Sequence, residues 1–395
     1  MTAGWDDYRA AATREYERSK ERADNLYPHY SENGSWVLLD IDALSSWRDG
    51  TYEHGNWTAG FWFGTMWLTA LASEDDGPVQ LAKSRLARLA GRATDSTTHD
   101  LGFLFYPSIV VGYECGFLGE RETLLAEEAA RTTARRFNDQ GRYIQAFGPV
   151  ADARTAGTST VDTLMNLPLL WWAYARTRDP RLLDVARHHA RTSARLLVRA
   201  DGSTIHLMQM DPLSGAFVTE STLQGASSDS AWSRGSGWVI CGLAWSYAVT
   251  REPELLSVAE RAAAYYESVA VEDELPPWDF TDATTDVPRD ASAAAAVALG
   301  YLILGSCHPD AQARKRYDEA GRDLLDVVSR LALNRDPDVD GILLHSCYSV
   351  PQGRGIDGST GWGDFFFGLA LAVAEDVLPL TKVLGPDLAP SSSDV

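Results

Sequence analysis

Two kinds of helix-forming segment alternate along this chain, and the alternation constrains its fold more than any other feature. Segments of the first kind place charged residues between apolar residues three and four positions apart, which is the pattern of a helix with one face in water. In 311–333, for example, Tyr317, Leu324 and Val328 recur at this spacing among Lys, Arg, Asp and Glu. Such helices are expected at 8–22, 79–93, 122–137, 181–199, 254–269 and 311–333.

Segments of the second kind are apolar on nearly every side and rich in Ala, Gly and aromatic residues. A helix without a polar face has to be buried all round. Helices of this kind are expected at 57–71, 103–117, 166–174, 238–249, 291–304 and 362–373.

Six segments of each kind interleave, and this order is typical of an all-α double ring of helices, an (α/α)6 barrel. The apolar helices would form the inner ring, and the loops at one of its ends would form a pocket. No linker interrupts the chain, so we expect a single domain over 1–389, followed by a disordered tail at 390–395. The one β-like interruption predicts a small hairpin near 201–219, with its turn at 211–215.

Composition limits the partners and the compartment. The formal net charge of −20 disfavours nucleic acid and anionic membrane surfaces. The start of the sequence shows no signal peptide, and no apolar run is long enough to span a membrane. Four scattered cysteines without a CxxC pair indicate reduced thiols and a cytoplasmic protein. The sequence does not indicate an oligomeric state.

The sequence lacks the complete motifs of common cofactor and metal sites. The stretch 336–341 opens like a calcium loop, but Cys347 stands where a bidentate Glu is needed. His188 and His189 are adjacent on a helix and diverge, so they do not chelate one metal. The sequence has no phosphate loop, dinucleotide fingerprint or nucleophile elbow. We therefore expect no cofactor and no metal.

Asp162 is the carboxylate in an otherwise apolar and hydroxyl-bearing segment, 159–172. Pro168 allows two local structures, because a proline is tolerated in the first helical turn but not further inside. Either the helix starts with Asn166 as its N-cap and Asp162 lies on the loop before it, or the helix is kinked at its start. On this segment alone, a capping role for Asp162 is the favoured interpretation.

Other polar residues stand at the starts of the remaining apolar helices: His99 and Asp100, Trp232 and Arg234, Arg289 and Asp290, and Asp364. Each has a structural explanation, either as a helix cap or as a buried ion pair, and we favour it for Arg289, Asp290 and Asp364. A barrel, however, brings all these helix starts to one rim. Two carboxylates, an imidazole, a guanidinium and several indoles would then meet in one cavity, as expected of a carbohydrate-active site.

Eight segments, in the same order, resemble the unsaturated glucuronyl hydrolases (glycoside hydrolase family 88). They are WTAGFW (57–62), HDLGF (99–103), VDTLMNLPLL (161–170), DGS (201–203) with His206, LQG (223–225), AWSRGSGW (231–238), PRDASAA (288–294) and WGDF (362–365).

The resemblance implies an (α/α)6 barrel that removes a 4,5-unsaturated uronic acid from the non-reducing end of oligosaccharides made by polysaccharide lyases. In that reaction a proton is added at C4 and water at C5 of the enol-ether double bond. The positions that match the family imply the following roles: Asp162 as general acid/base, Asp100 as the second essential carboxylate, and Trp57, His99, His206, Gln224, Trp232 and Arg234 as substrate-binding residues.

The sequence departs from the family at Ser236, where Gln is common, and at Gly358, where Glu is common. The loop 346–360, with Gln352, Arg354 and Ser359, therefore differs where the family reads the next sugar, and we expect Ser359 to contact substrate. The parent polysaccharide, its linkage and its sulfation stay open. Two alternatives also stay open: a conventional two-carboxylate glycosidase on the same barrel, and a sugar-binding protein without activity.

Overall fold

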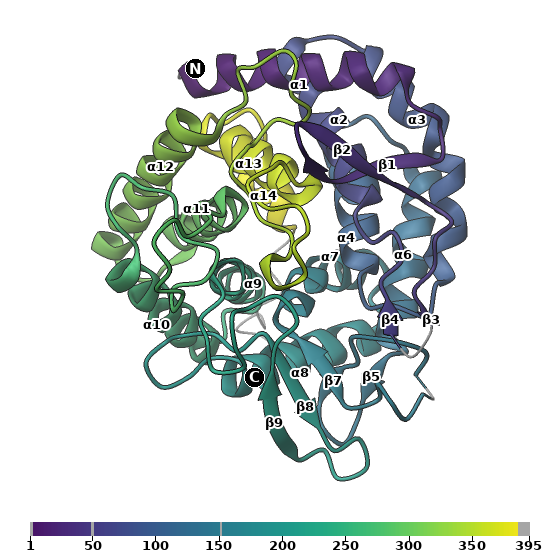
Figure 1. Cartoon of the computed structure of the whole chain (residues 1–395). Coiled ribbons are helices and arrows are strands. Elements are labelled where there is room, and N and C mark those ends of the chain that lie inside the picture. Colours follow the sequence, from purple (N-terminus) through teal and green to yellow (C-terminus); the bar gives the residue numbers. More distant parts are fainter. Residues whose placement is uncertain (1–2, 49–50, 151, 386–395) are drawn as a thin grey trace.

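The computed structural model describes residues 3–48, 51–150 and 152–385, and most of these residues are helical (Figure 1). The amphipathic segments form α1 (Ala3–Glu21), α3 (Gly77–Leu89), α6 (Glu120–Ala134), α8 (Pro180–Leu196), α10 (Pro253–Val269) and α12 (Ala311–Ala332). The apolar segments form α2 (Ala59–Ser73), α4 (Leu101–Phe105) continued by η2 (Tyr106–Val110) and α5 (Val111–Glu114), α7 (Leu167–Thr177), α9 (Ser233–Thr250), α11 (Ala291–Cys307) and α13 (Gly361–Ala374). Short helices occur at η1 (Ala90–Thr94), η3 (Val161–Asn166), η4 (Val350–Gln352) and α14 (Leu380–Leu384).

The apolar helices contact one another in a closed cycle. Along the chain α2 packs on α4, α4 on α7, α7 on α9, α9 on α11 and α11 on α13, and α13 returns to α2. The amphipathic helices lie outside them, each packed against an apolar neighbour (Figure 1). The burial follows the sequence pattern, because every residue of α9 is buried, whereas α12 buries only one face.

Two apolar helices differ locally from the sequence expectation. The second contains a π-helical turn, η2, which includes Pro107. Proline has no N–H to donate and crowds the preceding turn, and a widened turn accommodates it. The fourth begins at Ser233, so that Arg234 lies in its first turn and not before it.

The β structure is more extensive than the single hairpin expected at 201–219. Antiparallel pairs form between β1 (Leu26–Glu32) and β2 (Ser35–Asp40), β3 (Ser46–Arg48) and β4 (Thr51–Glu53), and β5 (Phe137–Asn138) and β6 (Tyr143–Ile144). The expected hairpin exists as β8 (Leu207–Met210) and β9 (Phe217–Ser221), and β7 (Thr158–Thr160) adds a third strand. The expectation of one β interruption was therefore wrong, because strands also form within 26–48, at 51–53 and within 137–144. The sequence does contain a turn signal within 26–48, the dipeptide Asn33-Gly34. Both residues adopt positive φ between β1 and β2, as this kind of hairpin turn requires.

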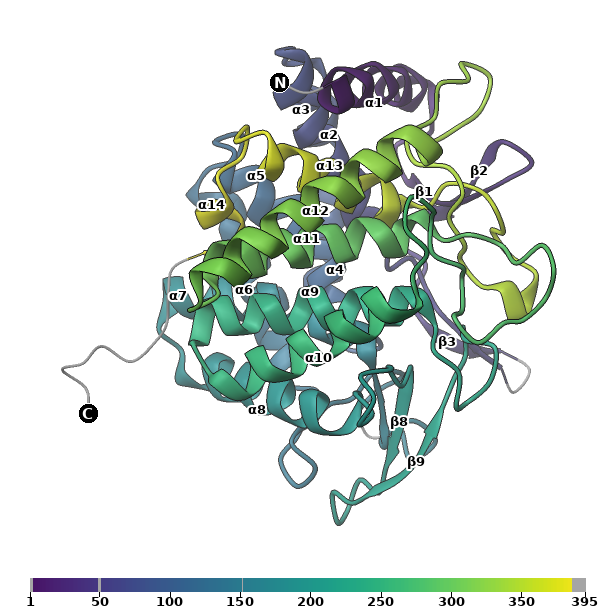
Figure 2. The same cartoon turned by 90° about the vertical axis from the view of Figure 1, so that its left-hand side faces the viewer.

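The strands gather at one end of the helical layers, and α5 and α14 lie at the other (Figure 2). The tail expected at 390–395 lies outside the described residues. Within the described part of the chain, no helix is both long and apolar enough to cross a membrane.

Candidate active site

A cavity opens among the starts of the apolar helices and encloses about 600 Å³, including solvent space at its mouth. It is lined by eight of the nine residues expected in the site: Trp57, His99, Asp100, Asp162, His206, Gln224, Trp232 and Arg234. The structure therefore brings together side chains that lie far apart in the sequence.

Asp162 reaches this cavity from η3, a 3-10 turn that leads directly into α7. Asn166 occupies the N-cap position of α7 and Pro168 lies in its first turn, as the first of the two expected local structures requires. The segment before α7 is helical, however, and not a loop. Asp162 does not cap a helix, and its Oδ1 is buried without a hydrogen-bond partner. The capping interpretation is therefore wrong for Asp162, and its carboxylate is available for other chemistry.

Asp100 stands at the N-cap position of α4 and likewise does not cap it. The cap comes from the neighbouring segment, because Oδ1 of Asn166 accepts a hydrogen bond of 3.0 Å from the backbone N–H of Phe103. Gly102 permits this close approach, since a Cβ there would lie 2.4 Å from the Cα of Asn166. The starts of α4 and η3 are thus held together, and both carboxylates are left free of capping.

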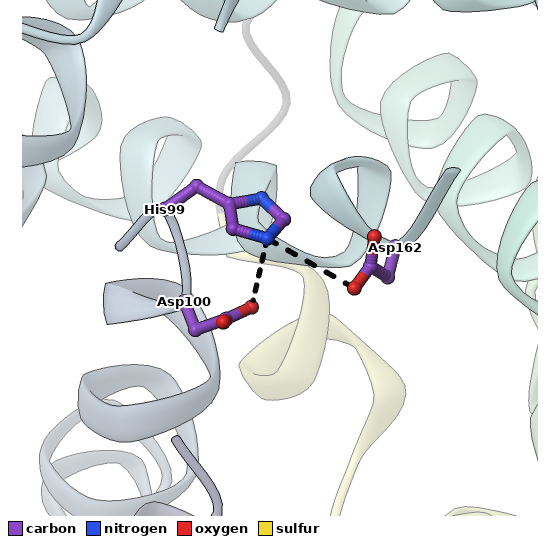
Figure 3. Close-up of side chains that lie close together, drawn as sticks. All are labelled: His99, Asp100 and Asp162. Carbon is purple, nitrogen blue, oxygen red and sulfur yellow. Dashed lines mark ion pairs between the residues drawn. The ribbon is translucent and has the colours of Figure 1, made fainter. Parts of the chain in front are cut away.

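His99 lies between the two carboxylates (Figure 3). Its Nε2 is 3.2 Å from Oδ1 of Asp100 and 4.0 Å from Oδ2 of Asp162. The contact with Asp100 is at ion-pair distance but is not aligned as a hydrogen bond, so Oδ1 of Asp100 has no hydrogen-bond partner. On its other side, Nδ1 of His99 is fixed by the hydroxyl of Thr163 at 2.7 Å.

The two carboxylates have different surroundings. The side chain of Asp100 is 7% exposed, whereas that of Asp162 is 24% exposed. Burial raises the pKa of Asp100, and the negative charge of Asp162 raises it further, against the opposing effect of His99. His99, Asp100 and Asp162 also offer ligand atoms within 4.8 Å of one another, a spacing that could hold a metal ion. The expected absence of a metal stays an expectation.

His206 is an uncharged hydrogen-bonding group at neutral pH, because burial lowers its pKa to about 4. Its Nδ1 accepts hydrogen bonds from the backbone N–H groups of Leu223, at 3.1 Å, and Gln224, at 3.3 Å. A neutral imidazole whose Nδ1 accepts carries its proton on Nε2. His206 therefore offers an N–H donor, with its ring set against Trp232 at 4.7 Å.

Arg234 is 2% exposed, and its terminal nitrogens are engaged by the protein itself. It pairs with Asp290 at 2.6 Å and donates to Oε1 of Gln224 at 2.9 Å. It also donates to the carbonyl oxygens of Cys347 and Tyr348. Since Oε1 of Gln224 is used in this way, the amide N–H groups of Gln224 remain for other partners.

Aromatic rings continue from Arg234 along the cavity. The guanidinium lies over the rings of Trp232, at 4.4 Å, and Trp362, at 5.1 Å. Trp362 in turn stacks on Trp57, with the ring centroids 5.1 Å apart and the planes 21° from parallel. Trp57 and Trp232 line the cavity and give it apolar faces of the kind on which sugar rings pack, whereas Trp362 is fully buried behind them.

Ser359 is the one expected site residue that the structure does not bring to the cavity. It is fully buried, and its hydroxyl donates to the carbonyl oxygen of Asp340 at 3.3 Å. Its backbone pairs with Ser31 on β1, which turns the side chain away from the cavity. Its position therefore does not support the expected contact with substrate.

Structural contacts occupy the three residues for which a structural role was favoured, but only Asp290 shows the expected helix cap and buried ion pair, and the buried pair expected for Arg289 was wrong. Asp290 caps α11 through the N–H of Ser292 and also pairs with Arg234. Arg289 pairs with Glu274 on the surface at 2.7 Å. Asp364 is buried and accepts hydrogen bonds from the backbone of residues 342 and 343.

Several cavity residues were missed from the sequence, among them His54, Phe147 and Tyr348. A signal existed for His54, a polar residue three positions before Trp57 at the start of an apolar helix. Phe147 and Tyr348 lie in loops whose path the sequence pattern does not predict.

Paired carboxylates, imidazoles and indole faces in one cavity of a helical ring are the groups expected of a glycoside hydrolase. No protein-family model matches the chain. It is 31% identical to the unsaturated glucuronyl hydrolase of Bacillus sp. (strain GL1) over 362 residues, which covers 89% of this chain and 91% of that protein. It is 33% identical to the unsaturated chondroitin disaccharide hydrolase of Streptococcus pyogenes serotype M1, over 81% and 82% of the two chains.

Solved structures agree with these sequence relationships. The crystal structure of the Bacillus sp. GL1 unsaturated glucuronyl hydrolase matches with a TM-score of 0.86 and 30% identity, over 95% of this chain and 97% of that one. The unsaturated glucuronyl hydrolase from Streptococcus agalactiae matches with a TM-score of 0.85 and 26% identity, over 95% and 93%. The chain belongs to the unsaturated glucuronyl hydrolase family.

Proposed function

We propose that this protein releases a 4,5-unsaturated uronic acid from the non-reducing end of oligosaccharides generated by polysaccharide lyases. The proposal includes a single (α/α)6-barrel catalytic domain over residues 1–389. One observation carries it: Asp100 and Asp162 converge, with His99 between them, in the cavity of a chain that belongs to this family. Relatives named for unsaturated glucuronyl and unsaturated chondroitin disaccharide substrates support the substrate class.

Asp162 is the proton donor in this proposal. Its Oδ1 has no hydrogen-bond partner within the described residues, and its side chain is the more exposed of the two carboxylates. Protonated Asp162 adds a proton to C4 of the enol-ether double bond, and positive charge develops at C5 and the ring oxygen. Water then adds at C5 and returns a proton to the Asp162 carboxylate. The hemiketal opens, and the sugar and a keto acid are released.

Asp100 and His99 assist from one side. Burial raises the pKa of Asp100 and favours its protonated form while Asp162 alternates between acid and base. A protonated Asp100 can donate a hydrogen bond to a substrate oxygen. His99, which is held by the hydroxyl of Thr163, fixes the positions of Asp100 and Asp162 relative to each other.

The substrate carboxylate needs donors that the protein does not already use. Arg234 supplies positive charge, but its terminal nitrogens bond to protein acceptors. The direct donors in this proposal are Nε2–H of His206 and the amide N–H groups of Gln224. Arg234 then acts by fixing Gln224 and by its field, which is effective in a cavity of low dielectric constant.

Conventional displacement with inversion fits this site less well. Inverting glycosidases separate their carboxyl groups by about 6.5–9.5 Å to hold a water between them. Ligand atoms of Asp100 and Asp162 lie within 4.8 Å of each other. Turnover in heavy-oxygen water separates the mechanisms: hydration places the label on the keto acid, whereas displacement places it at the anomeric carbon.

The deciding experiment is Asp162→Asn with a panel of lyase-generated disaccharides that differ in linkage and sulfation. We expect the wild type to consume the ultraviolet absorbance of the double bond. Asp162→Asn should lose at least about 100-fold in kcat, the scale of general acid catalysis, and still bind substrate. Asp184→Asn, on the exposed side of α8, is the matched control and should retain full activity. Near-normal turnover by Asp162→Asn would refute its role.

A further inference from the structure

We propose that His54 is a further substrate-contacting residue, whose imidazole forms a hydrogen bond with a hydroxyl group of the unsaturated uronic acid ring. The inference rests on the proposed function and adds to it a residue that lies outside the motifs shared with the family.

His54 is placed in the cavity by the short connection between β4 and α2. It lines the same space as Asp100 and Asp162. The backbone on its C-terminal side is fixed, because the N–H of Gly55 donates to Oγ of Ser45 at 3.1 Å and the N–H of Asn56 to the carbonyl oxygen of Ala43 at 2.8 Å. A Cβ at position 55 would lie 2.2 Å from that oxygen of Ala43, so only glycine fits there.

The ring of His54 is held by two aromatic neighbours. It meets Tyr52 edge-on at 5.2 Å and Phe147 at 5.0 Å. Tyr52 is itself fixed, since its hydroxyl donates to the carbonyl oxygen of Thr97 and accepts from the N–H of Gly148. The imidazole is therefore positioned before any ligand binds, which reduces the entropy lost on binding.

No residue that the structure describes forms a hydrogen bond or an ion pair with a ring nitrogen of His54. Across the described part of the chain, every other histidine has a hydrogen bond or an ion pair to a ring nitrogen. In the cavity, for instance, His99 bonds Thr163 and His206 bonds the backbone of Leu223. Among residues 3–48, 51–150 and 152–385, the ring of His54 contacts Tyr52 and Phe147 and has no hydrogen bond or ion pair. A fixed imidazole without a protein partner in a substrate cavity has the geometry of a ligand-binding group.

The chemistry of the ring selects a hydroxyl over a charged group. Burial, and then the neighbouring His99, lowers the pKa of His54 to about 4, so the imidazole is neutral near pH 7. A neutral imidazole offers one donor and one acceptor, and a sugar hydroxyl can pair with either. Asp162 and His99 line the same cavity and influence the charge of His54, so we place the hydroxyl on the ring that receives the proton.

The test compares His54→Phe, which keeps a ring of similar size, with His54→Gln, which keeps a donor and an acceptor. Each is measured on an unsaturated disaccharide and on its analogues lacking the hydroxyl at C2 or C3 of the unsaturated ring. We expect His54→Phe to lower kcat/KM about 10-fold, the scale of one hydrogen bond, and His54→Gln to recover most of it. On one deoxy analogue, wild type and His54→Phe should be equal. His188→Phe, on the outer face of α8, should act like the wild type.

Two results would overturn the inference: activity of His54→Phe within twofold of wild type, or a His54→Phe loss of the same size on all three substrates. The proposed function is tested separately by wild-type turnover. In the inactive Asp162→Asn background, the dissociation constant of the disaccharide should rise about 10-fold when His54→Phe is added. An unchanged constant there refutes the contact even if the catalytic assignment fails.

Discussion

The side-chain oxygen of Asn166 caps a helix to which Asn166 does not belong: it accepts the N–H of Phe103, in the first turn of α4, at 3.0 Å. A helix start normally takes its cap from its own N-cap residue, which here is Asp100. Because Asn166 supplies the bond, Asp100 is released to face the cavity. The same bond holds the segments that carry Asp100 and Asp162 side by side.

Asn166→Leu should therefore lower both stability and activity. The variant leaves the buried N–H of Phe103 without an acceptor, which costs about 1–3 kcal/mol. Urea unfolding should report this loss, and kcat/KM should fall because the hydrogen bond that joins the segments of Asp100 and Asp162 is removed. Unchanged stability and activity together would show that the bond does not hold the site.

Gly102→Ala should damage the same junction by steric conflict. The new Cβ would lie 2.4 Å from the backbone of Asn166, so α4 and η3 would have to separate. We expect a loss of about 1–3 kcal/mol in stability and a larger proportional loss in kcat. Gly91→Ala is the control, because a Cβ there meets nothing within 4 Å and φ is not positive. It should be neutral or slightly stabilising.

Asp100→Asn should stabilise the fold as it removes activity. A raised pKa means that the folded state holds the proton more tightly than the unfolded chain does. The stability that Asp100 contributes is thus complete below the ordinary pKa of about 3.9 and is lost as pH rises through the raised value. Relative to wild type, Asp100→Asn should gain stability as pH rises above about 4 and level off once pH exceeds the raised pKa of Asp100. Urea unfolding at several pH values measures this, and a falling difference would contradict it.

Asp290→Asn should be among the most destabilising single changes at this end of the molecule. Asp290 and Arg234 are both buried, with side-chain exposures of 0% and 3%, so the variant leaves a charged guanidinium without its counter-ion. Breaking such a pair costs about 3–5 kcal/mol. The comparison is Glu274→Gln, which breaks the half-exposed pair with Arg289 and should cost at most about 1 kcal/mol. Equal effects in urea unfolding would contradict the buried role of Asp290.

Much of this architecture could be predicted from the sequence, because the distribution of apolar and charged residues along a helix determines which of its faces are buried. The apolar and amphipathic segments form helices within a few residues of the expected bounds, and Pro168 correctly indicates the start of α7. The gathering of Asp100, Asp162 and Arg234 followed from the order of the helices alone.

The partners of these residues could not be predicted, since they come from other segments. Nothing near Phe103 indicates that its N–H is capped by Asn166. Likewise, Asp290 and the loop carbonyls that engage Arg234 are distant in sequence. Ser359 looked like a site residue by its loop, but pairing with β1 turns it inward. Patterns within a segment predict burial, whereas contacts between segments decide which polar atoms remain for substrate.

The stack of Trp57 on Trp362 also has a consequence for synthesis of the chain. Both carboxylates have been made by the time residue 162 leaves the ribosome, but one wall of their cavity is still missing. That wall includes Tyr348 and Gln352, and Trp362 supports it from behind by stacking on Trp57; these three residues are made about 200 residues later. During synthesis, the chain therefore contains Asp100 and Asp162 long before the cavity around them can be completed.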